Sequence, residues 1–165
     1  MLQTIAITKR DLPMKNRFLM SAAALICMLC AASFAFAAQS SDEAKAAEEI
    51  AAYDKKAQTT FSGLKYVVLR EGEGTKPNRG QTIDTHYVGR LMNGKLFDQS
   101  IGRGPFSFQV GTGQVIKAWD EALLDMKPGE KRALIVPPEL GYGRRGAGNV
   151  IPPNATLYFE VERLR

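Results

Sequence analysis

Residues 141–146 read Gly-Tyr-Gly-Arg-Arg-Gly, which matches the spacing of glycine-rich loops that bind dinucleotide phosphates. Such a loop needs a strand directly before it and the N-terminus of a helix directly after it. Here Pro137 and Pro138 interrupt the approach, and residues 147–153 cannot begin a helix at the required place. The segment is therefore not interpreted as a nucleotide site.

Histidine and cysteine offer little chemistry in this chain. His86 is the only histidine, so neither a histidine-based metal site nor a hydrolytic triad can be assembled. Cys27 and Cys30 have the spacing of a redox or metal pair. Both lie inside a long apolar run that is expected to be removed or to enter lipid. The sequence therefore predicts no metal, no cofactor and no catalytic thiol, with His86 a structural residue of a strand.

The apolar run covers residues 18–38, follows four basic residues and ends in Ala35-Phe36-Ala37. This pattern is typical of a secretory signal peptide cleaved near Ala37, so residues 1–37 are expected to be a signal. The alternative is an uncleaved membrane anchor, because 21 apolar residues just span a bilayer. The small residues at its end favour cleavage. Met14 is an alternative start.

Charge argues against nucleic acid as a partner. Of the 22 Lys and Arg, four lie in residues 1–37 together with one of the 17 Asp and Glu, which leaves 18 bases against 16 acids. The basic character belongs mostly to the export signal, so nucleic-acid binding loses its main support. We expect a periplasmic or secreted protein with no membrane contact once the signal is cleaved. The final residues, Val-Glu-Arg-Leu-Arg, are not a retention signal, which favours a bacterial periplasm.

Residues 38–60 are polar and rich in alanine. Ser41 or Asp42 can cap a helix there, with acids early in the segment and lysines late. The segment offers too few apolar positions for a coiled coil. A solvated helix or tether is favoured over a dimerisation arm.

Residues 110–124 contain the only tryptophan. Their apolar residues recur at three- and four-residue steps, which predicts one face of a short helix: Val115, Ile116, Trp119, Leu123 and Leu124. Glycines before this face and Pro128-Gly129 after it leave room for about three turns. A lone short helix is marginal in water, so other elements must cover its apolar stripe.

Six segments alternate in polarity or are apolar runs, as strands do: 63–69, 81–92, 95–98, 106–110, 131–136 and 158–164. In the second, Ile83, Thr85 and Tyr87 share one face. Asn93-Gly94 predicts a hairpin. The sequence thus predicts a β-sheet wrapped around one helix, with a long loop at residues 137–154 of the kind that is often functional.

The remaining candidates for chemistry are aromatic side chains with a few polar groups among them, any one of which is most simply explained as core. Together, however, the segments HYVGRLMNGKLFDQS, PFSFQVGTGQVIKAWDEAL, GYG and VIPPNATLYFEVERL closely resemble the FKBP family of peptidyl-prolyl isomerases. The resemblance covers residues 61–165, with every motif in family order. It implies an α+β fold in which a curled antiparallel half-barrel wraps around one short α-helix, leaving an apolar pocket between them.

The resemblance also implies which residues line that pocket. They are Tyr87, Phe97, Asp98, Phe106, Val115, Ile116, Trp119, Tyr142, Val150, Ile151 and Phe159. Catalytic contributions are expected from Phe97, Asp98, Tyr142 and the backbone N–H of Ile116. Leu140 and Ala147 depart from the family's frequent aromatic and histidine, which affects substrate preference and drug affinity more than activity.

The implied activity is cis–trans isomerisation of X–Pro bonds, which needs no acid, base or metal. It needs an apolar pocket that accepts the proline ring and favours the twisted amide. The expected partners are proline-containing polypeptides, above all unfolded exported proteins, and macrolide inhibitors of the family. The alternative is a non-catalytic holdase that uses the pocket only to bind peptides.

Overall fold

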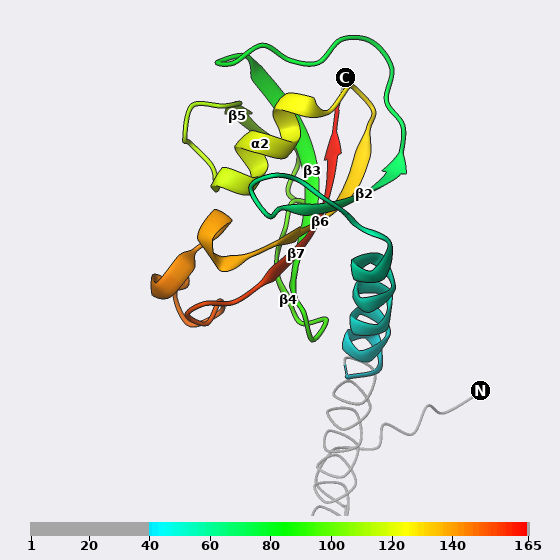
Figure 1. Ribbon diagram of the computed structural model, residues 1–165, viewed down its shortest axis with the longest axis vertical. Coiled ribbons are helices and arrows are strands. Elements are labelled where there is room, and N and C mark those ends of the chain that lie inside the picture. The colour runs from blue at the N-terminus through cyan, green and yellow to red at the C-terminus, as the bar shows by residue number, and fades with distance from the viewer. Residues whose placement is uncertain (1–39, 165) are drawn as a thin grey trace, which may run out of the picture. The chain divides into compact units, whose positions relative to one another are not determined.

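The computed structural model describes residues 40–164. Within that range seven strands form one antiparallel sheet (Figure 1). Their bounds are β1 (Gln58–Thr59), β2 (Lys65–Arg70), β3 (Thr82–Leu91), β4 (Leu96–Gln99), β5 (Phe106–Gln109), β6 (Lys131–Val136) and β7 (Leu157–Arg163). The predicted sheet and its six longer strands are confirmed, and β1 is an addition that the sequence did not indicate.

Strand β3 organises the sheet. The strand order is β1-β2-β6-β7-β3-β4, and β5 also pairs with β3. One edge of β3 pairs with β7 from Thr85 to Leu91, while the other pairs with β5 at Thr82–Thr85 and with β4 from Val88 onward. The hairpin predicted at Asn93-Gly94 is confirmed, because Gly94 has φ of 85° between β3 and β4. Strand β3 therefore brings residues from β4, β5 and β7 together.

Helix α2 (Lys117–Asp125) begins later than the sequence predicted. Val115 and Ile116 precede it, and Ile116 has an extended ψ of 149°. The buried face is formed by Ala118, Trp119, Ala122 and Leu123. The expected stripe is thus corrected at its start, because glycines at positive φ keep residues 111–113 irregular, and Val115 and Ile116 pack against the core from the loop rather than from the helix.

The main core lies between α2 and the facing side of the sheet (Figure 1). Alternation along the strands places Leu134 and Val136 of β6 there, together with Phe159 and Val161 of β7. Each of these side chains is at most 3% exposed. The helix is short, so this burial rather than intrinsic propensity holds it in place.

A second core lies on the opposite side of β6 and β7. Residues 40–56 are helical, and their Ile50 joins Ala133, Ile135 and Tyr158 in a buried cluster. Tyr53 stacks on Tyr158 with ring centroids 6.3 Å apart. The predicted helix is therefore present, but the expectation of a solvated helix or tether is wrong, because Ile50 and Tyr53 pack against the sheet. No helix within residues 40–164 has the length and apolar character needed to cross a membrane.

Two short 3₁₀ helices shape the long loop that follows β6. They are η1 (Pro138–Leu140) and η2 (Gly143–Arg145), and beyond them Ala147 and Ile151 form an isolated β-bridge. The glycine-rich segment 141–146 thus lies within 3₁₀ turns rather than between a strand and an α-helix.

Candidate functional site: an aromatic pocket over Trp119

A pocket of about 460 Å³ opens between the sheet, the start of α2 and the loop after β6. Trp119 projects from α2 and is only 4% exposed. Three rings meet it nearly edge to face: Tyr87 at 5.0 Å, Phe159 at 5.5 Å and Phe106 at 6.2 Å between centroids. Edge-to-face packing fixes aromatic rings in defined positions. The pocket therefore has a rigid apolar base.

Nine of the eleven predicted pocket residues line this space, together with Gln114, which the sequence did not single out. Val150 and Ile151 are the two that do not. The β-bridge between Ala147 and Ile151 turns Ile151 into the core, where it is 4% exposed, and leaves Val150 outside at 50% exposure. Leu140 and Ala147 are half-buried and pack against the main core.

Glycine at position 89 allows the Phe97 ring to enter the pocket wall. A Cβ at this position would lie 2.7 Å from the Phe97 ring, closer than Cβ atoms approach other atoms in proteins, and 3.0 Å from the Phe159 ring, which is a tight contact. Phe97 and Phe159 themselves pack edge to face with centroids 5.5 Å apart. The missing side chain on β3 is thus what lets these two walls meet.

Among residues 40–164, Asp98 is the one carboxylic acid that lines the pocket. Three donors hold its carboxylate. The Tyr87 hydroxyl donates to Oδ2 at 2.6 Å, and the Gln99 N–H donates to Oδ1 at 2.9 Å. Arg103 forms an ion pair with Oδ1. Burial raises the pKa of Asp98, but the hydrogen bonds from Tyr87 and Arg103 outweigh it and lower the pKa below 3.8. The carboxylate is therefore ionised at neutral pH.

The hydrogen bond between Tyr87 and Asp98 lowers the pKa of the carboxylate but raises that of the tyrosine. Burial, followed by the hydrogen bond to Asp98, raises the pKa of Tyr87 to about 12. Burial and then the charge of Asp98 also raise the pKa of Tyr142. Both hydroxyls consequently keep their protons at neutral pH and can donate hydrogen bonds.

Some polar groups of the pocket residues have no partner within residues 40–164, the buried Nε1 of Trp119 among them. The backbone N–H of Ile116 has no acceptor there, although the Ile116 carbonyl accepts from Trp119 N–H at 3.0 Å. The Tyr142 hydroxyl is likewise unpaired, and the residue is 39% exposed. Donors without partners near a helix start are available to an incoming carbonyl.

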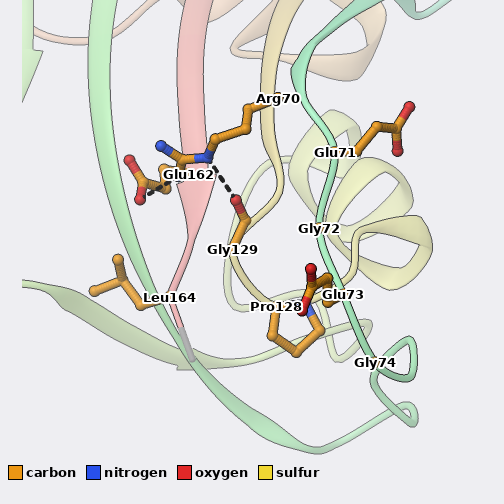
Figure 2. Close-up of a pocket in the computed structure, with 9 residues that line it drawn as sticks. All are labelled: Arg70, Glu71, Gly72, Glu73, Gly74, Pro128, Gly129, Glu162 and Leu164. Carbon is orange, nitrogen blue, oxygen red and sulfur yellow. Dashed lines mark hydrogen bonds and ion pairs between the residues drawn. The ribbon is translucent and has the colours of Figure 1, made fainter.

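A larger hollow of about 730 Å³ shares no residue with the aromatic pocket. Figure 2 shows the Arg70 guanidinium on the wall of this hollow. It donates hydrogen bonds to the Gly129 carbonyl at 3.0 Å and to the Glu162 carboxylate at 2.6 Å. The other lining residues include glycines, two further glutamates, a proline and a leucine, with no aromatic ring. This hollow therefore lacks the aromatic walls of the pocket over Trp119.

No group of three or more His, Cys, Asp and Glu side chains lies close enough within residues 40–164 to bind a metal ion. His86 contacts Ser100 through Nδ1 at 2.9 Å on β3, as a structural strand residue would. Cys27 and Cys30 fall outside the described residues.

Comparison with known proteins agrees with this geometry. The family model described as "FKBP-type peptidyl-prolyl cis-trans isomerase" matches residues 73–164. FK506-binding protein 1 of Dictyostelium discoideum is 52% identical over 101 residues, which are 61% of this chain and 94% of that protein. An FK506-binding protein of Neisseria meningitidis serogroup A is 54% identical over 98 residues, which are 59% of this chain and 90% of that protein.

A solved structure extends the likeness to three dimensions. The crystal structure of AtFKBP13 is similar with a TM-score of 0.64 and 41% identity, over 66% of this chain and 97% of that one. The predicted FKBP-like α+β fold is confirmed, as an open antiparallel sheet with α2 on one side and a second helix, residues 40–56, in addition. The chain belongs to the family of FKBP-type peptidyl-prolyl cis–trans isomerases and has the isomerase activity of that family.

Proposed function

We propose that this isomerase accelerates the folding of exported proteins by binding an X–Pro segment with the proline ring against Trp119. The barrier to peptide-bond rotation is about 18–20 kcal/mol because resonance keeps the amide planar. Twisting breaks that resonance. An apolar pocket that withholds water from the substrate carbonyl favours the twisted form, because hydrogen bonds from water stabilise the planar amide. The packed rings around Trp119 are the observation that carries this proposal.

Three polar groups then orient the peptide. The unpaired N–H of Ile116 binds one substrate carbonyl, and the Tyr142 hydroxyl binds another. Asp98 is held as an anion by Tyr87 and Arg103, so it acts through its charge on the twisted carbonyl or by orienting its neighbours. It transfers no proton. Phe97 completes the wall against the proline ring.

Several relatives have names that describe binding of FK506. We propose that macrolides of this kind enter the same pocket and compete with proline peptides. Trp119 is the only tryptophan, so its fluorescence reports occupancy by either ligand.

Export rests on the sequence of residues 1–37, which lie outside the described part of the chain. If they are a cleaved signal, the exported protein should begin at or near Ala38. Intact-mass measurement of the protein recovered from the periplasm or medium decides this. A mass that includes Cys27 and Cys30 would show that the segment is retained.

The isomerase assay with a Leu-Pro or Phe-Pro peptide tests the function directly. Asp98→Val and Phe97→Ala should each lower kcat/KM by about tenfold or more, equivalent to at least about 1.4 kcal/mol of transition-state stabilisation. Circular dichroism should show both variants folded. A wild-type protein that binds the peptide and suppresses aggregation without accelerating exchange would instead establish the holdase.

A further inference from the structure

The loop between β5 and α2, residues 110–116, supplies three lining residues of the pocket: Gln114, Val115 and Ile116. Two of its residues, Gly111 and Gly113, have φ of 76° and 79°. The loop is not part of a strand or a helix, so regular backbone pairing does not fix its shape. Something else must hold this wall against the aromatic rings.

Asp120 contacts both ends of that loop. Its Oδ1 accepts the N–H of Gly111 at 2.8 Å, and its Oδ2 accepts the N–H of Gly113 at 2.7 Å. Its own backbone N–H donates to the Ile116 carbonyl at 3.2 Å. Hydrogen bonds to an ionised acceptor are shorter and stronger than neutral ones. One residue of the first turn of α2 thus ties the beginning of the loop to its end.

We propose that Asp120 is a positioning residue for peptide binding: it fixes residues 111–116 so that the N–H of Ile116 and the side chain of Val115 face the pocket. The inference rests on the proposed role of the Ile116 N–H as a carbonyl donor. Asp120 lines no part of the pocket itself. Its effect on the substrate passes entirely through the loop.

The neighbouring acid Glu121 provides a matched control. It lies in the same helical turn and is also half-buried, but it accepts a hydrogen bond from Ser62 at 2.6 Å and does not touch the loop. Asp120→Asn and Glu121→Gln each replace one carboxylate by the amide of the same shape. Only the first replaces an oxygen that accepts a loop N–H with an NH₂ group that cannot accept.

In Asp120→Asn, hydrogen exchange at the amides of Gly111 and Gly113 should accelerate, and kcat/KM should fall by about five- to tenfold. The loss should appear mainly as a weaker Kd for peptide, measured by Trp119 fluorescence, because Phe97 and Asp98 are untouched. Glu121→Gln should leave all three readouts within about twofold of wild type. All measurements are made under conditions in which circular dichroism shows both variants to be fully folded. A general loss of stability would therefore not change these readouts.

Asp120→Glu keeps both acceptor oxygens and the charge, so it should recover part of the lost kcat/KM and of the amide protection. Unchanged exchange in Asp120→Asn would overturn the proposal. Faster exchange at the Gly111 and Gly113 amides without weaker peptide binding, in either Asp120 variant, would also overturn it. Asp120→Glu provides this test if Asp120→Asn does not fold. If wild type itself fails to accelerate isomerisation, the proposed function fails instead, and the two results are thereby distinguished.

Discussion

The Tyr87 hydroxyl lies 2.6 Å from Asp98 Oδ2, and the Tyr87 ring packs against Trp119 with centroids 5.0 Å apart. One side chain therefore connects the apolar base of the pocket to its charged wall. Since the Gln99 N–H and Arg103 occupy the other oxygen of Asp98, neither oxygen is free to rotate toward solvent without losing a bond. The carboxylate thus has a defined direction as well as a charge.

Tyr87→Phe should lower kcat/KM by about three- to tenfold while the ring remains in place. The substitution removes a hydrogen bond to a charged group, an interaction worth about 1.5–3 kcal/mol before solvent screening reduces it. It should also raise the pKa of Asp98, because that hydrogen bond lowers it. Tyr66→Phe is the control, since the Tyr66 hydroxyl bonds Gln58 at 3.0 Å away from the pocket. Equal kcat/KM values for Tyr87→Phe and Tyr66→Phe would show that the hydrogen bond from Tyr87 to Asp98 does not contribute to catalysis.

The activity should vary little from about pH 6 to pH 8, because no catalytic group need titrate there. Asp98 has a lowered pKa in the folded protein, so its ionised form is fully present above its unfolded pKa of 3.8 and is lost as pH falls through the lower folded value. Burial and Asp98 raise the pKa of Tyr87 to about 12, which keeps its hydroxyl protonated. The check is kcat/KM against pH, with circular dichroism at each point to exclude acid unfolding. A bell-shaped profile between pH 6 and 8 would contradict this assignment.

Much of the sheet was predictable because side-chain alternation is a local property. Ile83 and Thr85 are buried at 5% and 0% exposure, and Tyr87 lines the pocket, all on the face that the sequence assigned. The start of α2 was predicted less well. Periodicity alone includes Val115 and Ile116 in the helix, whereas Asp120 and two glycines at positive φ hold them in a loop.

The rest depended on contacts between distant segments. The bridge between Ala147 and Ile151, which takes Val150 and Ile151 away from the pocket, has no pattern in the local sequence. Gln114 reaches the pocket only through the shape of its loop. One sequence signal for the second core was not used in the prediction. The apolar run 133–136 has no polar face, as expected of a strand buried on both sides.

Ile50→Ala should destabilise the domain without changing catalysis. Ile50 is 1% exposed in a cluster that shares no residue with the pocket. Truncating a buried isoleucine to alanine costs about 2–5 kcal/mol. Urea unfolding should show that loss, with kcat/KM within about twofold of wild type under folding conditions. Glu48→Ala, at an exposed position of the same helix, should change stability by less than about 0.5 kcal/mol. Similar unfolding midpoints for the two variants would mean that the helix does not support the domain.

Gly89→Ala should damage the pocket from a position that does not line it. Gly89 does not have a positive φ, so alanine fits the backbone and any effect is steric. The new Cβ would lie 2.7 Å from the Phe97 ring and 3.0 Å from that of Phe159. Both rings must shift. They pack against each other, Phe159 packs against Trp119, and both line the pocket, so we expect the shift to change the pocket's shape. Overpacking of this kind costs about 1–3 kcal/mol of stability.

The expected result for Gly89→Ala is a fall in kcat/KM of about tenfold, with weaker peptide binding by Trp119 fluorescence at a temperature where the variant remains folded. Val88→Ala is the matched control, because successive residues of a strand face opposite sides of the sheet. It removes side-chain volume from the neighbouring position of β3 without adding an atom beneath Phe97. It should therefore lower stability while kcat/KM stays near wild type. If Gly89→Ala matches Val88→Ala in kcat/KM, the Phe97 and Phe159 rings do not define the catalytic wall.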